Sequence, residues 1–552
     1  MAETITTVSG GLQGLADFLD SFTGGIGLIS FSVMLGALIW KAFMLEALPL
    51  DEHDRDDLSR RSLRWLIIGA WILAATHAIA LISKGVVLKE TLGHLPWGAY
   101  TATVQFKAGL LRMFLSAALA ITANDLVGDP RKPSRWQLTW LLALAISICG
   151  AWLTHGVGRF ENRGLLMQVT VLHQLAGAIW FGGILQLIVL WRWVRRHPGC
   201  DTLWPLALRR FALIGVSAVV VLLATGLLLA FSYVDSLAAL IGTGYGSLLL
   251  IKTTLMLAAL EFAWINHRAA RKWEKDHGYK RVFGTIPHIV EAESFLLVSI
   301  LFVAATLSSQ PPAVDIPQLI APAGEVWQMF SPKIPTLTSP THEQLMIGEI
   351  QRATIVGKEA PVFAAQWSNF NHNVAGLFLT IMAAVALLGY LSKAPWANYW
   401  PAGFIALGIF LFFRSDAQAW PMGPLGFWES TLGDGEILQH RLATLLTFVL
   451  GGLEIRARSN PQARNLRYMF PILCAFGGVL LLTHSHSGFE LKTEYLIQST
   501  HMVMGLLAIF MATTRWLELK LEPPYAQWAG LVATTSMALV GLILLFYDEP
   551  IY

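Results

Sequence analysis

Apolar runs of about 20 residues recur along the chain and are separated by short polar segments, which is the length that an α-helix needs to cross a bilayer. Lipid offers the backbone no hydrogen-bond partners, so each run is expected to be helical. The pattern therefore predicts an all-α, polytopic helical membrane protein with about 14 transmembrane helices. The predicted spans are residues 24–45, 64–85, 103–123, 136–157, 167–191, 211–233, 247–266, 288–308, 371–391, 397–413, 438–455, 469–486, 496–514 and 527–547.

The basic residues are distributed unevenly between the two sets of loops. Loops that follow odd-numbered spans carry most of the Lys and Arg, as in Arg60-Arg61, Arg131-Lys132, Arg195-Arg196 and Arg271-Lys272. Loops rich in Lys and Arg stay in the cytoplasm. This bias predicts that both termini lie outside, and residues 1–23, which carry neither Lys nor Arg, agree with it.

A long polar segment divides the chain. Residues 309–370 begin Ser309-Gln310-Pro311-Pro312, are rich in proline, and include a stretch at 342–353 that has the pattern of a short amphipathic helix. The predicted organisation is an N-terminal eight-helix membrane domain at 1–308, an extracytoplasmic linker at 309–370, and a C-terminal six-helix membrane domain at 371–552. A second outer loop, 414–437, contains several carboxylates that could draw cations to the outer side.

Histidines of the C-terminal part gather at the predicted outer ends of their helices. Two open a span, one lies near the outer start of another, and two close a span one residue apart: His372, His440, His501, His484 and His486. Four helices thus deliver imidazole to one outer layer, which predicts a metal site there. The alternative is that these are interfacial histidines that hydrogen-bond headgroups or loop carbonyls.

The N-terminal part repeats this placement. His77 lies in the outer half of its span, His155 closes a span at the outer side, and His173 lies just inside the next one. An ionisable residue within the membrane is a functional candidate by default. These histidines are predicted to form a second site or the entrance to a path; the alternative is that they are satisfied core residues that pack helices.

Imidazole suits copper, zinc and haem iron, and thioether sulfur adds a preference for Cu(I). Met422 lies in the acidic outer loop, and Met504 shares a helix face with His501, so both are candidate ligands, although methionine is more often core filler. Histidines at one level on facing helices could instead hold haem b between them. Copper and haem b therefore both remain open on the residues alone.

Composition excludes several classes of function. Charged residues make up 14% of the chain, against about 25% in soluble proteins, and the basic ones sit in short loops, so the bilayer rather than nucleic acid is the expected partner. No phosphate-binding loop, nucleophile elbow or zinc-protease motif occurs, so the protein is not expected to be an enzyme. The three cysteines form no paired motif.

Two glycine pairs lie within predicted spans. Gly182-Gly183 and Gly451-Gly452 are predicted to allow close helix packing.

Several segments resemble the CopD copper-resistance family of membrane proteins. The run from His173 through Trp180 to Gly183, with Leu153-Thr-His155 upstream, looks like the motif of that family. The remaining matches are Arg210-Phe211 through Thr225-Gly226, Thr243-Gly-Tyr-Gly246, Lys252, Asn266, and Glu291 to Pro312. Later runs are similar to the C-terminal part of longer members: Trp420 to Ser430, Gln439-His440-Arg441, Leu482 to His486, and Arg515 to Leu519.

The resemblance implies copper binding and copper transport from periplasm to cytoplasm across the bacterial inner membrane, in copper homeostasis or resistance. It also implies a CopC-type periplasmic copper carrier as partner. The chain contains no segment long enough before its first span to be such a carrier, so the carrier is expected to be a separate protein.

Overall fold

A computed structural model describes residues 2–345, 362–391, 394–483 and 491–550. Helices dominate, and the described residues contain no β-strand beyond a single isolated bridge between Ala419 and Leu425. The all-α prediction is therefore confirmed. Twelve helices in the described part are long and apolar enough to cross a membrane.

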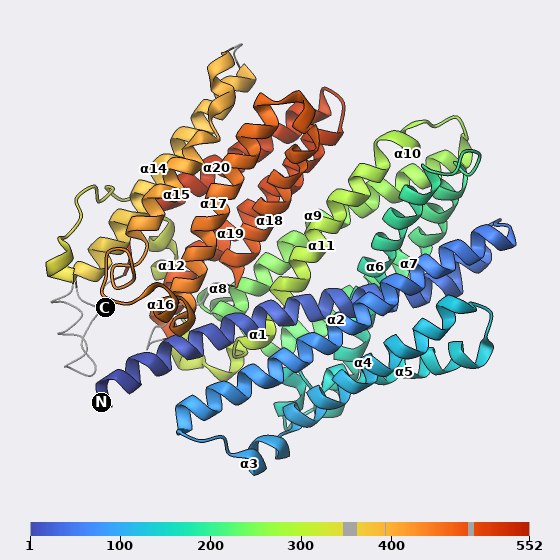
Figure 1. Cartoon of the computed structure of the whole chain (residues 1–552), viewed down its shortest axis with the longest axis horizontal. Helices are drawn as coiled ribbons and strands as arrows, with labels where there is room; N and C mark the ends of the chain where they lie inside the picture. Colours follow the sequence, from blue (N-terminus) through green and yellow to red (C-terminus); the bar gives the residue numbers. More distant parts are fainter. Residues whose placement is uncertain (1, 346–361, 392–393, 484–490, 551–552) are drawn as a thin grey trace. The chain divides into compact units, whose positions relative to one another are not determined.

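In the described residues, each of the fourteen predicted spans lies largely on a helix, and residues 484–486 of the span 469–486 lie outside them (Figure 1). Two of these helices, α5 (Pro133–Ala151) and α17 (Gly435–Ser459), are not among the twelve. In α17 charged residues lie near both ends, Glu436 at its start and Arg456 and Arg458 at its end. Its middle, residues 442–453, has no charged side chain and remains suited to a membrane.

The chain forms two compact units. The first comprises Met1–Phe18, Ser236–Ile251 and Ala313–Tyr552; the second comprises Leu19–Asp235 and Lys252–Pro312. One unit boundary, Pro312/Ala313, lies close to the predicted end of the N-terminal domain at residue 308. The predicted domain limits stay a prediction, because the units also divide α1 (Ala2–Ile39) and α9 (Gly244–Lys275).

Helices of the second unit pack through an apolar core that includes Phe31, Met34, Leu66, Leu119 and Ile146. The other helices that belong to this unit are α2 (Glu52–Leu92), α3 (Trp97–Ala102), α4 (Val104–Gly128), α5, α6 (Arg163–Val194), α7 (Leu203–Tyr233), α10 (Arg281–Gly284) and α11 (Ile286–Ser309).

Two glycine positions let helices of this unit touch directly. A Cβ on Gly182 would overlap the backbone of Ser32 and Gly36, and one on Gly183 would overlap the ring of Phe211. Close packing at this glycine pair is therefore confirmed. In the C-terminal pair, a Cβ on Gly451 would come within 2.8 Å of Ile405, whereas Gly452 has nothing within 4 Å. Only the first glycine of that pair is needed for packing.

The first unit contains a bundle of helices from the C-terminal part of the chain: α14 (Val362–Leu391), α15 (Ala402–Arg414), α17, α18 (Met469–Leu482), α19 (Leu491–Lys520) and α20 (Tyr525–Leu545). Figure 1 shows these helices running alongside one another, and their apolar core includes Met382, Phe404, Phe470, Cys474 and Met537. Short helices α8 (Leu237–Gly242), α12 (Ala323–Phe330) and α16 (Phe427–Gly433) also belong to this unit. The predicted helix at 342–353 lies largely outside the described residues.

Candidate metal centre

Three asparagines in the third turn of α14 attach that turn to two other chain segments. The Asn371 side chain donates to the carbonyl of Arg414, the last residue of α15, at 2.6 Å. Asn373, 1% exposed, donates to the carbonyls of Leu544 and Tyr547 at 3.1 and 2.9 Å. Asn369 donates to the Asp548 carboxylate at 2.7 Å. The start of α14, the end of α15 and the segment after α20 therefore meet at one end of the bundle.

His372 lies within this turn and faces His501 of α19. The two ring centres are 5.6 Å apart and the ring planes are nearly perpendicular, at 84°. Two imidazoles that share one metal through nitrogens at about 2.0 Å have ring centres roughly 5–6 Å apart. The spacing of the pair thus matches that of two histidine ligands on a common ion. His501 is 6% exposed, so the pair is shielded from solvent on its side.

Hydrogen bonds determine the tautomer of both rings. His372 Nδ1 lies 2.8 Å from the carbonyl of Ser368, and His501 Nδ1 lies 3.0 Å from the carbonyl of Ile497. A carbonyl oxygen only accepts, so each Nδ1 must donate its proton. In the neutral imidazole the lone pair is then on Nε2, and a second-shell bond of this kind is what orients a metal-binding histidine.

Tyr547 covers this histidine pair. Its ring centre lies 4.2 Å from that of His372 and 6.3 Å from that of His501. The segment after α20 is held in place by Asn369 and Asn373 and by an ion pair of 2.9 Å between Lys333 and Asp548. The sequence does not single out Tyr547, because a tyrosine at the end of the last helix carries no motif.

His440 stands in a separate, acidic environment at the start of α17. Its Nδ1 lies 2.8 Å from Asp416 Oδ1, and the other oxygen of that carboxylate, Oδ2, accepts from the hydroxyl of Ser415 at 2.8 Å. A carboxylate behind a histidine fixes the ring and raises its basicity as a ligand. Asp434 caps α17 through the backbone nitrogens of Glu436 and Ile437. Burial, and then the nearby Glu436, raise the pKa of Asp434 above its ordinary value.

The other predicted ligands of this part are spread more widely. Met504 is buried in α19, 1% exposed, one turn after His501. Met422 is 42% exposed in the loop between α15 and α16. His484 and His486 lie outside the described residues. Within the described ranges, no group of three or more His, Cys, Asp or Glu side chains is arranged to hold a metal ion. The predicted five-histidine site stays a prediction.

The N-terminal histidines belong to the second unit and have different partners. His173 Nδ1 lies 3.0 Å from the hydroxyl of Thr225 in α7. His155 begins the short helix η3 (His155–Gly158), and its Nε2 lies 3.4 Å from the carbonyl of Leu307. The Nε2 of His77 is buried and lacks a hydrogen-bond partner in the described structure. His173 and His155 thus each have a hydrogen-bond partner within the unit.

Buried cations near these histidines oppose a second cation. Arg112 of α4 is 6% exposed, lies over the ring of Phe31 at 5.3 Å, and acts electrostatically on His77. Lys252 of α9 acts in the same way on His173. A positive charge in a low-dielectric interior raises the cost of placing a metal ion beside it. These cations therefore disfavour a metal ion beside His77 or His173, and the predicted N-terminal site stays a prediction.

Residues of three motif segments meet inside the second unit. The indole of Trp180 and the side-chain amide of Asn266 each donate to the Glu293 carboxylate at 2.8 Å, and Glu293 is fully buried. These residues come from α6, α9 and α11. The sequence motif thus marks a polar contact that joins three helices, as well as histidine positions.

Two comparisons with known proteins match part of the chain. Residues 205–307 match the family model described as copper resistance protein D, CopD. A segment of 177 residues is 32% identical to "Copper transport protein CutJ" of Bacillus subtilis (strain 168), and covers 32% of this chain and 31% of that protein. No solved structure matches the chain. The expected resemblance is confirmed for this region.

Proposed function

We propose that the chain binds copper at the predicted outer end of its C-terminal bundle and transports it inward, and the match of its residues 205–307 to the CopD family model supports this. The proposal extends to copper homeostasis or resistance at the bacterial inner membrane, with copper moving from periplasm to cytoplasm. The support for transport is the printed name of the similar Bacillus protein, of which the matched segment spans 31%. Transport rather than catalysis is the activity that this name indicates.

The single observation that carries the binding site is the geometry of His372 and His501. Their ring centres are 5.6 Å apart, and each Nδ1 donates to a backbone carbonyl of its own helix, so each Nε2 carries the lone pair that a metal requires. Copper is a suitable ion for imidazole ligands. His484 and His486 are proposed to approach the same outer layer, and Met504 to offer sulfur from α19.

His440 is proposed to receive copper before or beside this pair. Its carboxylate partner Asp416, with Asp434 and Glu436 nearby in the chain, gives the outer loop a negative charge that attracts cations. Met422, exposed in the same loop, is proposed as a docking ligand. A separate CopC-type periplasmic carrier is the proposed donor, and His77, His155 and His173 are proposed to serve the N-terminal part of the path.

The binding claim is tested by the double variant His372→Ala/His501→Ala in the purified full chain. Copper affinity, measured by competition with a colorimetric Cu(I) chelator, should fall at least about tenfold. The matched control is His277→Ala, because His277 Nδ1, in the turn after α9, also contacts the carbonyl four residues earlier, that of Trp273, at 3.0 Å. Equal affinity in the double variant and wild type would remove the site.

The transport claim needs vesicles. Proteoliposomes that contain wild-type protein should accumulate copper faster than vesicles without protein, and the double variant should accumulate it more slowly. Rates equal to those of empty vesicles would refute transport while leaving binding intact.

The competing prediction of haem b, which neither comparison names, is tested on the same preparation. A Soret band in the absorption spectrum would support haem. Bound copper without a Soret band would support copper.

A further inference from the structure

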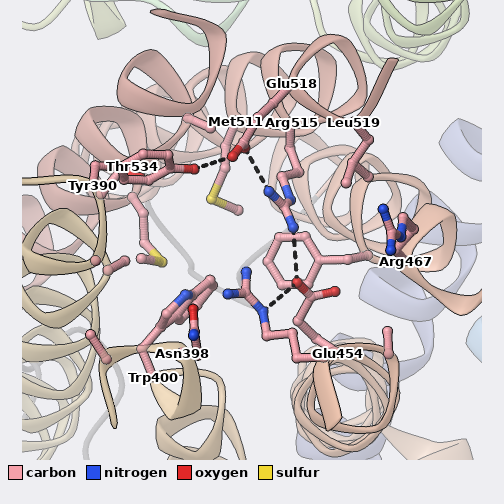
Figure 2. A pocket seen from close by; sticks show the side chains of 18 residues that line it. Tyr390, Asn398, Trp400, Glu454, Arg467, Met511, Arg515, Glu518, Leu519 and Thr534 are labelled. Carbon is pink, nitrogen blue, oxygen red and sulfur yellow. Dashed lines mark hydrogen bonds and ion pairs between the residues drawn. The ribbon is translucent and has the colours of Figure 1, made fainter. Parts of the chain in front are cut away.

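A cavity of about 390 Å³ lies in the C-terminal bundle, at the end opposite the histidine pair. Figure 2 shows it between the last turns of α14 and α19, where Tyr390, Arg515 and Glu518 point toward one another. Tyr390 follows His372 on α14 by 18 residues, which is about 27 Å along a helix. By the charge bias of the loops, this end faces the cytoplasm. The cavity is therefore distinct from the proposed copper site.

A network of ion pairs forms one wall of the cavity. Arg515 contacts Glu518 at 2.6 Å through Nη1 and Glu454 at 3.1 Å through Nη2. Arg458 contacts the same Glu454 oxygen at 2.8 Å through Nε, and the Tyr390 hydroxyl donates to Glu518 (Figure 2). The network joins α14, α17 and α19. Both carboxylates are already paired with arginines. The arginine N–H groups that make no ion pair therefore remain to bind a ligand.

Positive charge exceeds negative charge around the cavity. Three arginines and two glutamates line it, and the third arginine, Arg467, has no acidic partner within ion-pairing distance in the part of the chain that the structure describes. Arg458 uses only Nε in its ion pair. A guanidinium presents several donors in a planar fork that matches the oxygens of a phosphate. The surplus charge and the fork geometry favour a phosphate anion.

Three buried polar atoms of the network make no hydrogen bond and further define the ligand. Arg515 Nε is a donor and Glu454 Oε2 is an acceptor without a partner among the described residues, whereas Glu518 Oε2 has its ion pair with Arg515. Glu454 is 1% exposed. A buried unsatisfied group costs free energy, so the complementary ligand should supply both an acceptor and a donor. A phosphate ester that carries a hydroxyl group meets both needs.

Apolar and aromatic side chains complete the wall, among them Trp400, Phe470 and Met537. Aromatic residues flank the same end of the bundle: Lys520 lies over the rings of Tyr468 and Trp516 at 4.2 and 5.1 Å. Such aromatic and basic side chains gather at the headgroup level of a bilayer. The cavity therefore has the composition and position of a headgroup site.

We propose that this cavity binds a phosphoglycerol group, with Arg458 and Arg467 on the phosphate and Glu454 accepting from a glycerol hydroxyl. The group has two sources with the same chemistry, the headgroup of phosphatidylglycerol and free glycerol phosphate. Because the cavity and the histidine pair share no residue, this inference stands independently of copper binding.

The test measures binding of short-chain phosphatidylglycerol to the purified full chain by native mass spectrometry and thermal shift. Arg467→Gln should weaken binding at least fivefold while leaving the ion-pair network intact. Arg456→Gln is the matched control, because it removes one arginine from the same end of α17 and does not line the cavity. Arg458→Lys, which keeps the charge and loses the fork, should weaken binding as well.

Further arms separate the two sources. Binding of phosphatidylglycerol with none of glycerol phosphate assigns the site to lipid, and the reverse assigns it to a free metabolite. Phosphatidylcholine, which has no hydroxyl and no net charge, should bind at least tenfold more weakly. Equal binding of phosphatidylcholine, equal losses in Arg467→Gln and Arg456→Gln, or no binding of either phosphoglycerol compound would each overturn the proposal.

Discussion

The ring centres of His372 and His501 lie 5.6 Å apart, with the ring planes at 84°, although the two residues are 129 positions apart in the chain. Each is oriented by a backbone carbonyl of its own helix, and the ring of Tyr547 covers the pair. This contact is the most developed element of the proposed copper site. It depends on the packing of α14, α19 and the segment after α20, and the first predictions address these supports.

Asn373→Ala should loosen the cover over the histidine pair. The side chain is 1% exposed and satisfies the carbonyls of Leu544 and Tyr547, so its loss leaves two acceptors without that donor and costs about 1–3 kcal/mol. Thermal unfolding of the variant should show a lower Tm than that of wild type, and the copper affinity should also be lower. Gln462→Ala, which removes an exposed amide, is the control and should leave both unchanged. An unaltered Tm in Asn373→Ala would show that the tail is held by other contacts.

Gly376→Ala should separate α14 from α20. A Cβ at this position would overlap the backbone nitrogen of Leu545, and backbone atoms cannot move aside as a flexible side chain can. We expect a loss of stability of about 1–3 kcal/mol, as for other overpacked positions. The comparison variant is Gly452→Ala, where nothing lies within 4 Å of the added methyl group, so it should be neutral or slightly stabilising. Equal Tm values for the two variants would contradict the close helix contact.

Asp416→Asn should weaken the contribution of His440 to metal binding. The carboxylate 2.8 Å from His440 Nδ1 orients the ring, and loss of such a partner typically costs about 10–100-fold in metal affinity. The measurement is copper affinity in Asp416→Asn, His440→Ala and the double variant. If Asp416 acts through His440, the double variant should be no weaker than His440→Ala. Additive losses would instead show that Asp416 acts independently.

Glu454→Gln should destabilise the inner end of the bundle. The carboxylate is 1% exposed and pairs with both Arg458 and Arg515, so its neutralisation leaves Arg458 without a counter-charge and Arg515 with Glu518 alone. Breaking a buried pair in this way costs about 3–5 kcal/mol. Thermal unfolding should show the loss, whereas the exposed Glu522→Gln should behave as wild type. Restored stability in Glu454→Gln/Arg458→Gln would further support the assignment.

The stability of the outer loop should fall as pH rises from acid to neutral. Burial raises the folded-state pKa of Asp434, with Glu436 as a further cause, so the protonated form is favoured in the fold. A group of this kind contributes stability below its unfolded pKa and loses it as pH passes through the raised folded pKa. Asp434→Asn retains a capping side chain and removes this titration. The Tm of this variant minus that of wild type should therefore increase from pH 4 to pH 7. A Tm difference that does not change with pH would contradict the raised pKa.

The sequence anticipates the individual helices far better than their contacts. As far as the structure describes them, the fourteen predicted spans lie largely on helices, because hydrophobic length and backbone satisfaction in lipid are local properties of a run of residues. Asp416 is recognisable only as one of several loop carboxylates, and its bond to His440 depends on how the loop after α15 returns to α17. Tyr547 carries no local signal, since its role follows from the position of α20 against α14.

The sequence alone therefore determines the membrane class, the helix positions and the resemblance to the CopD family, and it predicts the side of the membrane on which each histidine lies. These properties follow from apolar run length, from the distribution of Lys and Arg, and from local motifs. The tertiary structure decides which groups meet: His372 with His501 under Tyr547, and Arg458 and Arg515 on Glu454 beside an arginine-lined cavity. Apolar helix faces attract without direction, so such pairings emerge only once side chains and close backbone contacts select one packing.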